Sequence, residues 1–304
     1  NAGYQGEISE RSLQALRSHA RGAAVRSISR DRALSQIAER FESNDLKAKL
    51  LKGAAMDSAV YPREAFRLGC DVDMLVCEKD FERVEGLLSG LAENIEKTPG
   101  RPATTAFAVE KTFVINGPVR VQIDVHREVT VPHVFPIDYV AMFARCETHP
   151  AFDGKFGRLS DEDNLLQFAM HSFYDLQMFS KQTVDACMLM KRGQIDWETL
   201  IERAQTYRVM LPLKYLIEGV RHVFGYSPPG AVVKRLKLHG ARKWLAYRLL
   251  TKSPRWLSGP GPGFRVRQLA AQVLLSGNVR GWLWYYSHYA GAKLRDFWFV
   301  LFRG

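Results

Sequence analysis

The sequence predicts an α+β protein with an α/β-type core, in which a small mixed β-sheet is flanked by helices and followed by an all-helical domain. Three observations predict this fold. Short apolar segments alternate with helix-like segments in the first half of the chain, a hairpin signal follows them, and the pattern after Ser160 is helical. The 304 residues, 46% of them hydrophobic, are enough for two domains and a sizeable core.

Four regions follow from these patterns. They are N-terminal helices at 1–45, a sheet-containing core at 46–150, a helical domain at 151–225 and a basic, Trp- and Tyr-rich helical region at 226–304. In the first region, apolar residues recur at spacings of three and four, which predicts one or two helices over 9–43.

The core is expected to contain two strands, each followed by a helix. The first strand is the apolar run at 48–51, after which Lys52 and Gly53 open a helix that is rich in small residues. The second strand, "GCDVDMLV" at 69–76, precedes a helix over 80–95 that has a single apolar stripe. This order predicts a sheet with helices packed on it.

A β-hairpin and then a helical region complete the expected fold. The hairpin is predicted over 111–126 because Asn116 and Gly117, which both tolerate positive φ, separate two β-rich runs. Ser160 and Asp163 fit a capping box at the start of the first helix of the next region. The remaining pattern up to residue 225 is helical.

Three aspartates are the strongest chemical signal in the sequence. Successive side chains of a strand point to opposite faces, so Asp71 and Asp73 share one face. The same alternation puts Asp124 on the polar face of its strand, beside Gln122 and His126. If the two strands are neighbours, the three carboxylates meet on one surface.

Clustered carboxylates repel one another and raise their own pKa values unless a cation compensates them. Mg²⁺ suits this role because it prefers hard oxygen ligands and keeps open positions for substrate phosphates. Two such ions can activate an attacking oxygen and stabilise a leaving one. An Asp-x-Asp pair alone is common on surface strands, so the prediction of a metal site depends on the whole ordered set of residues.

A phosphate contact is expected on the N-terminal side of the Asp-x-Asp pair. The small residues Gly53 and Ala54 allow backbone N–H groups at a helix start to approach a phosphate, and Lys52 adds a positive charge. Arg67, four residues before Asp71, is a further candidate for this contact.

The ordered motifs resemble a known family. The segments "LLKGAAMDSAVYPREAFRLGCDVDMLV" and "VQIDVH", with the helical segment that begins at "NLLQFAMHSFYDLQMF", are similar to the uncharacterised nucleotidyltransferase family of the DNA polymerase β superfamily. The resemblance covers roughly residues 30–225. It implies a nucleotidyltransferase catalytic core at 46–150 that moves a nucleoside monophosphate (NMP) from a nucleoside triphosphate (NTP) such as ATP to a hydroxyl or similar acceptor, with release of pyrophosphate.

The resemblance also implies roles for individual residues. Asp71 and Asp73 would bind two Mg²⁺ ions, for which Mn²⁺ could substitute, and Asp124 would bind the catalytic ion and is a candidate general base. Gly53 would lie at the triphosphate turn. Ala54 departs from the Ser or Gly that many superfamily members have there, so a hydroxyl contact to phosphate is missing.

Two other functions remain open at this stage. A glycosyltransferase also uses an Asp-x-Asp pair to hold a metal against a nucleotide diphosphate, but this function leaves Lys52, Gly53 and Asp124 unexplained. Alternatively, the protein could be a non-catalytic binding protein that keeps the fold and attaches to a membrane or a partner through its basic C-terminal region.

Other polar residues are weaker candidates for the site. His126 lies on the face of Asp124 and could contact a substrate. His171 and Asp175, four residues apart on one helical face, could orient a substrate or form a structural pair. Asp185 stands among apolar residues, so a structural salt bridge is expected there.

The C-terminal region differs from the rest of the chain in charge. Residues 231–304 contain 14 Lys and Arg but one acid, Asp296, a net charge of +13 that leaves −2 for residues 1–230. Its aromatic residues could pack on the helical domain, lie on anionic lipid or a protein partner, or bind nucleic acid. Because residues 1–230 have no basic footprint, a small-molecule or peptide acceptor is favoured over nucleic acid.

The expected location is the cytoplasm, with a peripheral position at a membrane as an alternative. No secretory signal is recognised, and no apolar run reaches the roughly 18 residues of a membrane-spanning helix. No zinc-site or disulfide spacing links the four cysteines, which are Cys70, Cys77, Cys146 and Cys187.

Overall fold

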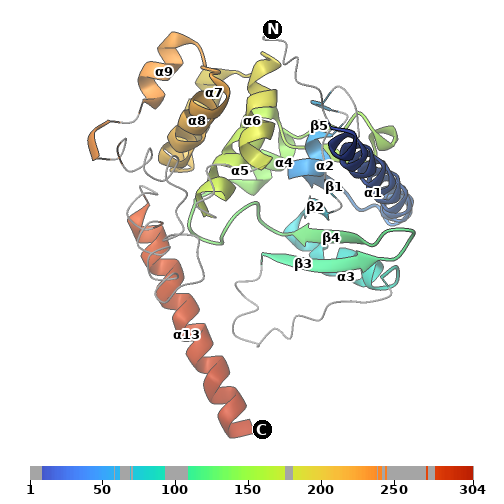
Figure 1. The fold of residues 1–304 in the computed structure, drawn as a ribbon. Helices are drawn as coiled ribbons and strands as arrows, with labels where there is room; N and C mark the ends of the chain where they lie inside the picture. The colour runs from blue at the N-terminus through green and yellow to red at the C-terminus, as the bar shows by residue number, and fades with distance from the viewer. Residues whose placement is uncertain are drawn as a thin grey trace.

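A computed structural model confirms the α+β fold (Figure 1). The residues that it describes are 9–57, 59–61, 69, 71–92, 109–174, 181–237, 239–241, 244, 272 and 278–303. The strands are β1 (Ala48–Leu51), β2 (Asp71–Val76), β3 (Glu110–Ile115), β4 (Val121–His126), β5 (Glu147–Thr148) and β6 (Gly157–Arg158). The helices are α1 (Glu10–Ser43), α2 (Lys52–Met56), α3 (Phe81–Ser89), α4 (Tyr139–Ala144), α5 (Asp161–Tyr174), α6 (Lys181–Lys191), α7 (Trp197–Thr206), α8 (Met210–Phe224), α9 (Gly230–Leu236) and α13 (Val279–Arg303).

The strands form a mixed sheet in the order β3-β4-β2-β1-β6-β5. The predicted hairpin is present, since β3 and β4 pair antiparallel. Its connection spans residues 116–120, and neither Asn116 nor Gly117 has the positive φ on which the turn prediction was based. Strand β2 lies between β4, to which it is parallel, and β1, to which it is antiparallel. The two strands that were expected to carry carboxylates are therefore direct neighbours.

Helices α1 and α3 cover one face of the sheet. The predicted N-terminal helical region is one continuous 34-residue helix, in which Ser9 caps the first turn by accepting a hydrogen bond from the backbone of Ser12. Apolar residues at alternate strand positions, such as Val72 and Ile123, are completely buried against these helices. This face is closed to solvent, so polar chemistry is confined to the other one.

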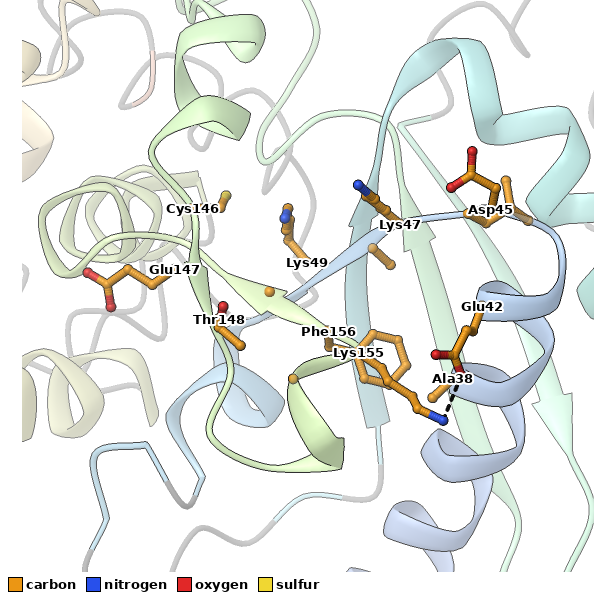
Figure 2. Close-up of a pocket in the computed structure, with 14 residues that line it drawn as sticks. Ala38, Glu42, Asp45, Lys47, Lys49, Cys146, Glu147, Thr148, Lys155 and Phe156 are labelled. Carbon is orange, nitrogen blue, oxygen red and sulfur yellow. Dashed lines mark ion pairs between the residues drawn. The ribbon is translucent and has the colours of Figure 1, made fainter.

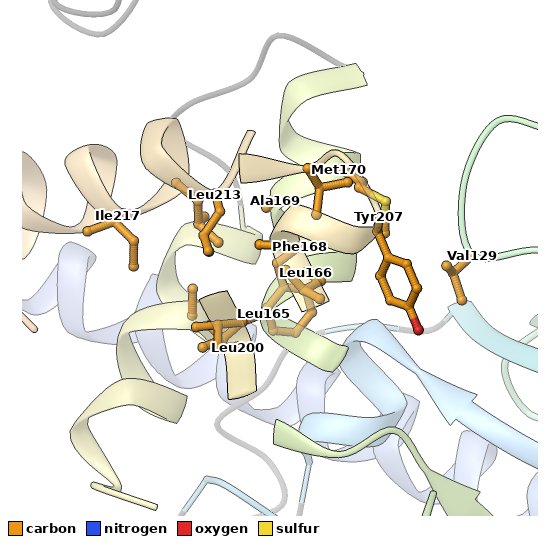
Figure 3. Close-up of a cluster of buried hydrophobic side chains, with 14 of the residues drawn as sticks. Val129, Leu165, Leu166, Phe168, Ala169, Met170, Leu200, Tyr207, Leu213 and Ile217 are labelled. Carbon is orange, nitrogen blue, oxygen red and sulfur yellow. The ribbon is translucent and has the colours of Figure 1, made fainter. Parts of the chain in front are cut away.

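The opposite face of the sheet joins the helical region. Leu51 and Leu75 belong to the same buried cluster as residues of α5, α6, α7 and α8. Figure 3 shows the centre of this cluster, where Leu165, Phe168 and Leu200 lie together. The expected capping of α5 is present, because the backbone N–H of Asp163 donates to Ser160 Oγ at 3.3 Å.

The two shortest strands do not follow the sequence prediction. Strand β6 pairs parallel with β1 and antiparallel with β5, yet it lies within 151–225, where only helices were expected. A two-residue strand has no measurable periodicity, so its pairing partner decides its conformation. None of the described helices is both long and apolar enough to cross a bilayer.

Candidate functional site

The parallel pairing of β2 and β4 places three carboxylates on one face of the sheet. Asp73 lies directly opposite Asp124 in the register, and Asp71 lies opposite Gln122. Asp71 is exposed, Asp124 is half-buried and Asp73 is only 7% exposed. The three aspartates therefore share one face of the sheet as predicted, and they are buried to different extents.

Asp73 is held by two basic side chains. Lys52 Nζ lies 2.5 Å from Asp73 Oδ1, and His126 Nε2 lies 2.9 Å from the same oxygen. The contact with Lys52 follows from β1, whose last residue, Leu51, pairs with Asp73. His126 Nδ1 is also 3.3 Å from Glu110 Oε2. Lys52 was expected to meet a phosphate, and in the structure it contacts a carboxylate.

These contacts determine the charge of Asp73. Burial raises the pKa of this carboxyl, but the hydrogen bond from His126 and the charges of Lys52 and His126 outweigh burial and lower the pKa to about 2. Asp73 is therefore ionised at neutral pH, although it lies almost out of contact with solvent.

Asp124 is oriented by neighbours on two strands. Thr112 Oγ1 donates to Asp124 Oδ1 at 2.6 Å, and Gln122 Nε2 donates to Oδ2 at 2.9 Å. Thr112 was not predicted as a site residue, although the hairpin register alone places it opposite Asp124. The two donors fix the plane of a carboxylate that faces the polar side of the sheet.

The donor set suits a hard divalent cation, because all three predicted ligands are carboxylates. As the side chains stand, Asp73 contacts Lys52 and His126, and Asp124 contacts Thr112. Within the described part of the chain, no three His, Cys, Asp or Glu side chains converge closely enough to hold a metal. Metal binding would therefore require Asp73 to exchange at least one of its basic partners for the ion.

The strand–turn–helix predicted at Lys52 is present. Helix α2 follows β1 without a linker, and Lys52 has a φ of 47°, which is unusual for a residue with a side chain. Such backbone strain persists where neighbouring structure imposes it and is frequent at functional sites. Here the ion pair with Asp73 holds the Lys52 side chain across the start of α2.

The far end of α2 is supported by residues that the sequence prediction missed. Arg30 of α1 lies 2.6 Å from Asp57, which follows α2, and both residues are buried. His149 is 1% exposed and interacts with the backbone of Ala54, and its Nδ1 accepts a hydrogen bond from Ala151 N at 3.2 Å. Burial lowers the pKa of His149, so the imidazole that lies next to α2 is uncharged at neutral pH.

The buried state of His149 predicts a pH dependence of stability. Its folded-state pKa is lower than its unfolded pKa, so the stability that neutral His149 contributes is complete above the unfolded pKa of about 6.5 and is lost as the pH falls. We expect the free energy of unfolding in urea to decrease from pH 7 to pH 5, and to decrease less in His149→Gln. The exposed His19 of α1 gives the control, since His19→Gln should keep the full decrease. Equal pH dependence of His149→Gln and the wild type would contradict this prediction.

The described contacts do not connect the remaining predicted site residues to Asp71, Asp73 or Asp124. Arg67 and Asp175 lie outside the described residues, and His171 lies half-buried in α5. Asp185 is completely buried and accepts a hydrogen bond from Tyr61 Oη at 2.6 Å, and the salt bridge expected there stays a prediction.

A separate cavity of about 380 Å³ lies at the other end of β1 (Figure 2). Its lining combines Lys47 and Lys49 with Glu147, and it includes the ion pair between Lys155 and Glu42 at 2.8 Å. None of the three aspartates lines this cavity. The candidate site is therefore the open carboxylate-bearing face of β2 and β4, and not this hollow.

Together, the mixed sheet, the paired aspartates on neighbouring parallel strands and the lysine-led turn define the class of protein as a nucleotidyltransferase-like α+β protein. The family model described as uncharacterised nucleotidyltransferase matches residues 2–225, and the chain belongs to this family. The match begins earlier than the resemblance over roughly 30–225 and includes all of α1. No curated protein and no solved structure matches the chain significantly.

Proposed function

We propose that this protein is a Mg²⁺-dependent nucleotidyltransferase that moves an NMP from an NTP to a hydroxyl or similar acceptor and releases pyrophosphate. The observation that carries this proposal is the register of β2 and β4, which sets Asp73 beside Asp124 with Lys52 in contact. Membership of a nucleotidyltransferase family favours nucleotidyl transfer over the glycosyltransferase alternative.

Asp71, Asp73 and Asp124 would hold the metal. When bound, Mg²⁺, or Mn²⁺ in its place, would neutralise phosphate charge and lower the pKa of the attacking hydroxyl. Asp73 is suited to this role because it is ionised at neutral pH, and the metal would take the place of a basic partner such as Lys52. Lys52, once released from Asp73, would have its ammonium group free for a triphosphate oxygen.

In the proposed reaction, the acceptor oxygen attacks the α-phosphorus, and the bond to the pyrophosphate oxygen breaks. Asp124 is placed to accept the hydroxyl proton, because Thr112 and Gln122 hold its carboxylate in one orientation. Catalysis then depends on positioning and on electrostatic stabilisation of an in-line displacement. The acceptor that we favour is a small molecule or a peptide, since residues 1–230 have a net charge of only −2.

Calorimetric titration tests the proposal at its first step. ATP, GTP, CTP and UTP are titrated with Mg²⁺ into the wild type and into Asp71→Asn/Asp73→Asn. We expect saturable binding of at least one nucleotide, weakened by about tenfold or more in the double variant, because it loses two charged ligands. A Glu82→Gln variant, changed at an exposed position of α3, should bind as the wild type does.

The result that would overturn the proposal is nucleotide binding of equal affinity in the double variant and in the presence of a chelator. Circular dichroism shows whether the double variant is folded. A donor screen then separates the enzyme classes, since pyrophosphate release from an NTP supports nucleotidyl transfer, and sugar release from a nucleotide sugar supports glycosyl transfer.

A further inference from the structure

We propose that α13 attaches the protein to the surface of an anionic membrane by lying in the plane of the interface. This helix lies outside the part of the chain that matches the nucleotidyltransferase family, which ends at residue 225. The proposal is therefore independent of the proposed reaction. It rests on how α13 is anchored, which face it exposes and which charges border that face.

The N-terminal end of α13 is fixed to the body of the protein. The side-chain amide of Asn278 donates a hydrogen bond to the carbonyl of Val134, and the rings of His133 and Trp284 lie 4.7 Å apart. A Cβ at Gly281 would lie 2.6 Å from the same carbonyl oxygen, so glycine allows this close approach. The helix cannot turn freely about its axis, and its outer face is defined.

The inner and outer faces of α13 have different exposures. Trp282, Ala292 and Asp296 are at most 2% exposed and share one face at the helical repeat of about 100° per residue. Leu283, Leu294, Phe297 and Trp298 are 53–61% exposed and lie on the other side, whereas Trp284, whose ring contacts His133, lies between the two faces. Figure 1 shows α13 extending away from the sheet and the other labelled helices.

This outer face carries an apolar stripe about 23 Å long, from the span between residues 283 and 298 and a rise of about 1.5 Å per residue. Large apolar side chains that are exposed together on one helix face mark an interaction surface. Aliphatic Leu283 and Leu294 stand between the aromatic residues, and aliphatic side chains do not stack on bases. The stripe is therefore better suited to lipid than to nucleic acid.

The charges next to the stripe select an anionic surface. Arg280, Lys293 and Arg295 are exposed on α13, whereas Asp296, its one acidic residue, is buried. Basic residues beside Trp, Leu and Phe match the pattern of helices that lie at the headgroup level and bind anionic lipids.

Co-sedimentation of the full-length protein with lipid vesicles tests the proposal. We expect the protein to pellet with vesicles that mix phosphatidylcholine and phosphatidylglycerol, and to remain in solution with phosphatidylcholine alone. In Leu294→Asp/Phe297→Asp, binding should weaken at least ~10-fold, because two apolar side chains no longer enter the lipid. Leu16→Asp in α1 is the matched control, since Leu16 is 58% exposed and Leu294 is 61% exposed.

A charge-reversal variant tests whether binding requires the basic residues of α13. Lys293→Glu/Arg295→Glu should weaken binding to the anionic vesicles, as should added salt, because both reduce the attraction to the headgroups. Circular dichroism and gel filtration establish that each variant is folded and monodisperse.

The proposal would be overturned if the wild type failed to bind anionic vesicles, or if Leu294→Asp/Phe297→Asp bound them as well as the wild type does. Binding of a single-stranded oligonucleotide that this apolar variant weakens would assign the stripe to nucleic acid, and so would also overturn it.

Discussion

The variant Asp124→Asn should lower the rate of NMP transfer by about 10³-fold, because it removes both a charge at the reacting phosphate and the acceptor of the hydroxyl proton. Asn has almost the same size and can still accept from Thr112, which donates to Oδ1 at 2.6 Å. The free energy of unfolding should therefore change much less than activity. This separation of activity from stability distinguishes a catalytic carboxylate from a structural one.

The rate of NMP transfer is measured as the release of pyrophosphate from the NTP that binds in the calorimetric titration. An extract of small molecules and peptides supplies the acceptor until the acceptor is identified. Gln122→Ala is the matched control, because Gln122 is exposed and contacts Asp124 without being a proposed ligand, and we expect less than about a tenfold loss. If Asp124→Asn kept a rate within tenfold of the wild type, the catalytic role of Asp124 would be wrong.

The largest effect on stability is expected at Asp163, at the start of α5. This carboxylate is completely buried and accepts two hydrogen bonds from Arg145, at 3.0 and 3.2 Å. Arg203 of α7 lies 3.3 Å from it, and Arg145 also donates to Tyr207 Oη at 3.0 Å. Removing Asp163 leaves two guanidinium groups without their shared anion, and a broken buried pair costs about 3–5 kcal/mol.

We therefore expect Asp163→Ala to lose about 3–5 kcal/mol of unfolding free energy, a large part of the roughly 5–15 kcal/mol of a typical domain. Urea unfolding followed by circular dichroism gives this value. Glu202→Ala in α7 is the control, because it removes an exposed acid and should change stability by less than about 0.5 kcal/mol. A loss below about 1 kcal/mol in Asp163→Ala would show that the network is not needed for stability.

Local pattern was enough to predict most of the elements near the site. The alternation of polar and apolar residues places Asp71 and Asp73 on one face of their strand and Asp124 on the polar face of its own strand. The two β-rich runs around Asn116 and Gly117 predicted the β3–β4 hairpin, although neither residue has a positive φ in the turn. Strands β5 and β6 could not be predicted in the same way, since each has two residues and depends on its neighbours for pairing.

The partners of the site residues could not be read from the sequence. Lys52 and His126 are 21 and 53 residues away from Asp73, yet both contact its Oδ1. Arg30 is likewise distant in the sequence from its partner: it lies in α1 and forms an ion pair with Asp57, just after the end of α2. Sequence reasoning assigned Lys52 to a phosphate because it adds a positive charge at a helix start whose small residues let a phosphate approach.

The sequence by itself determined the α+β fold class, the shared face of Asp71 and Asp73, and the contrast in charge between the basic C-terminal region and the rest of the chain. These properties depend on side-chain alternation and composition, which are local. Only the tertiary structure decided that Lys52 and His126 contact Asp73, and that α13 has one buried and one exposed face. Both are contacts between segments distant in the chain, and packing of the folded protein determines which segments meet.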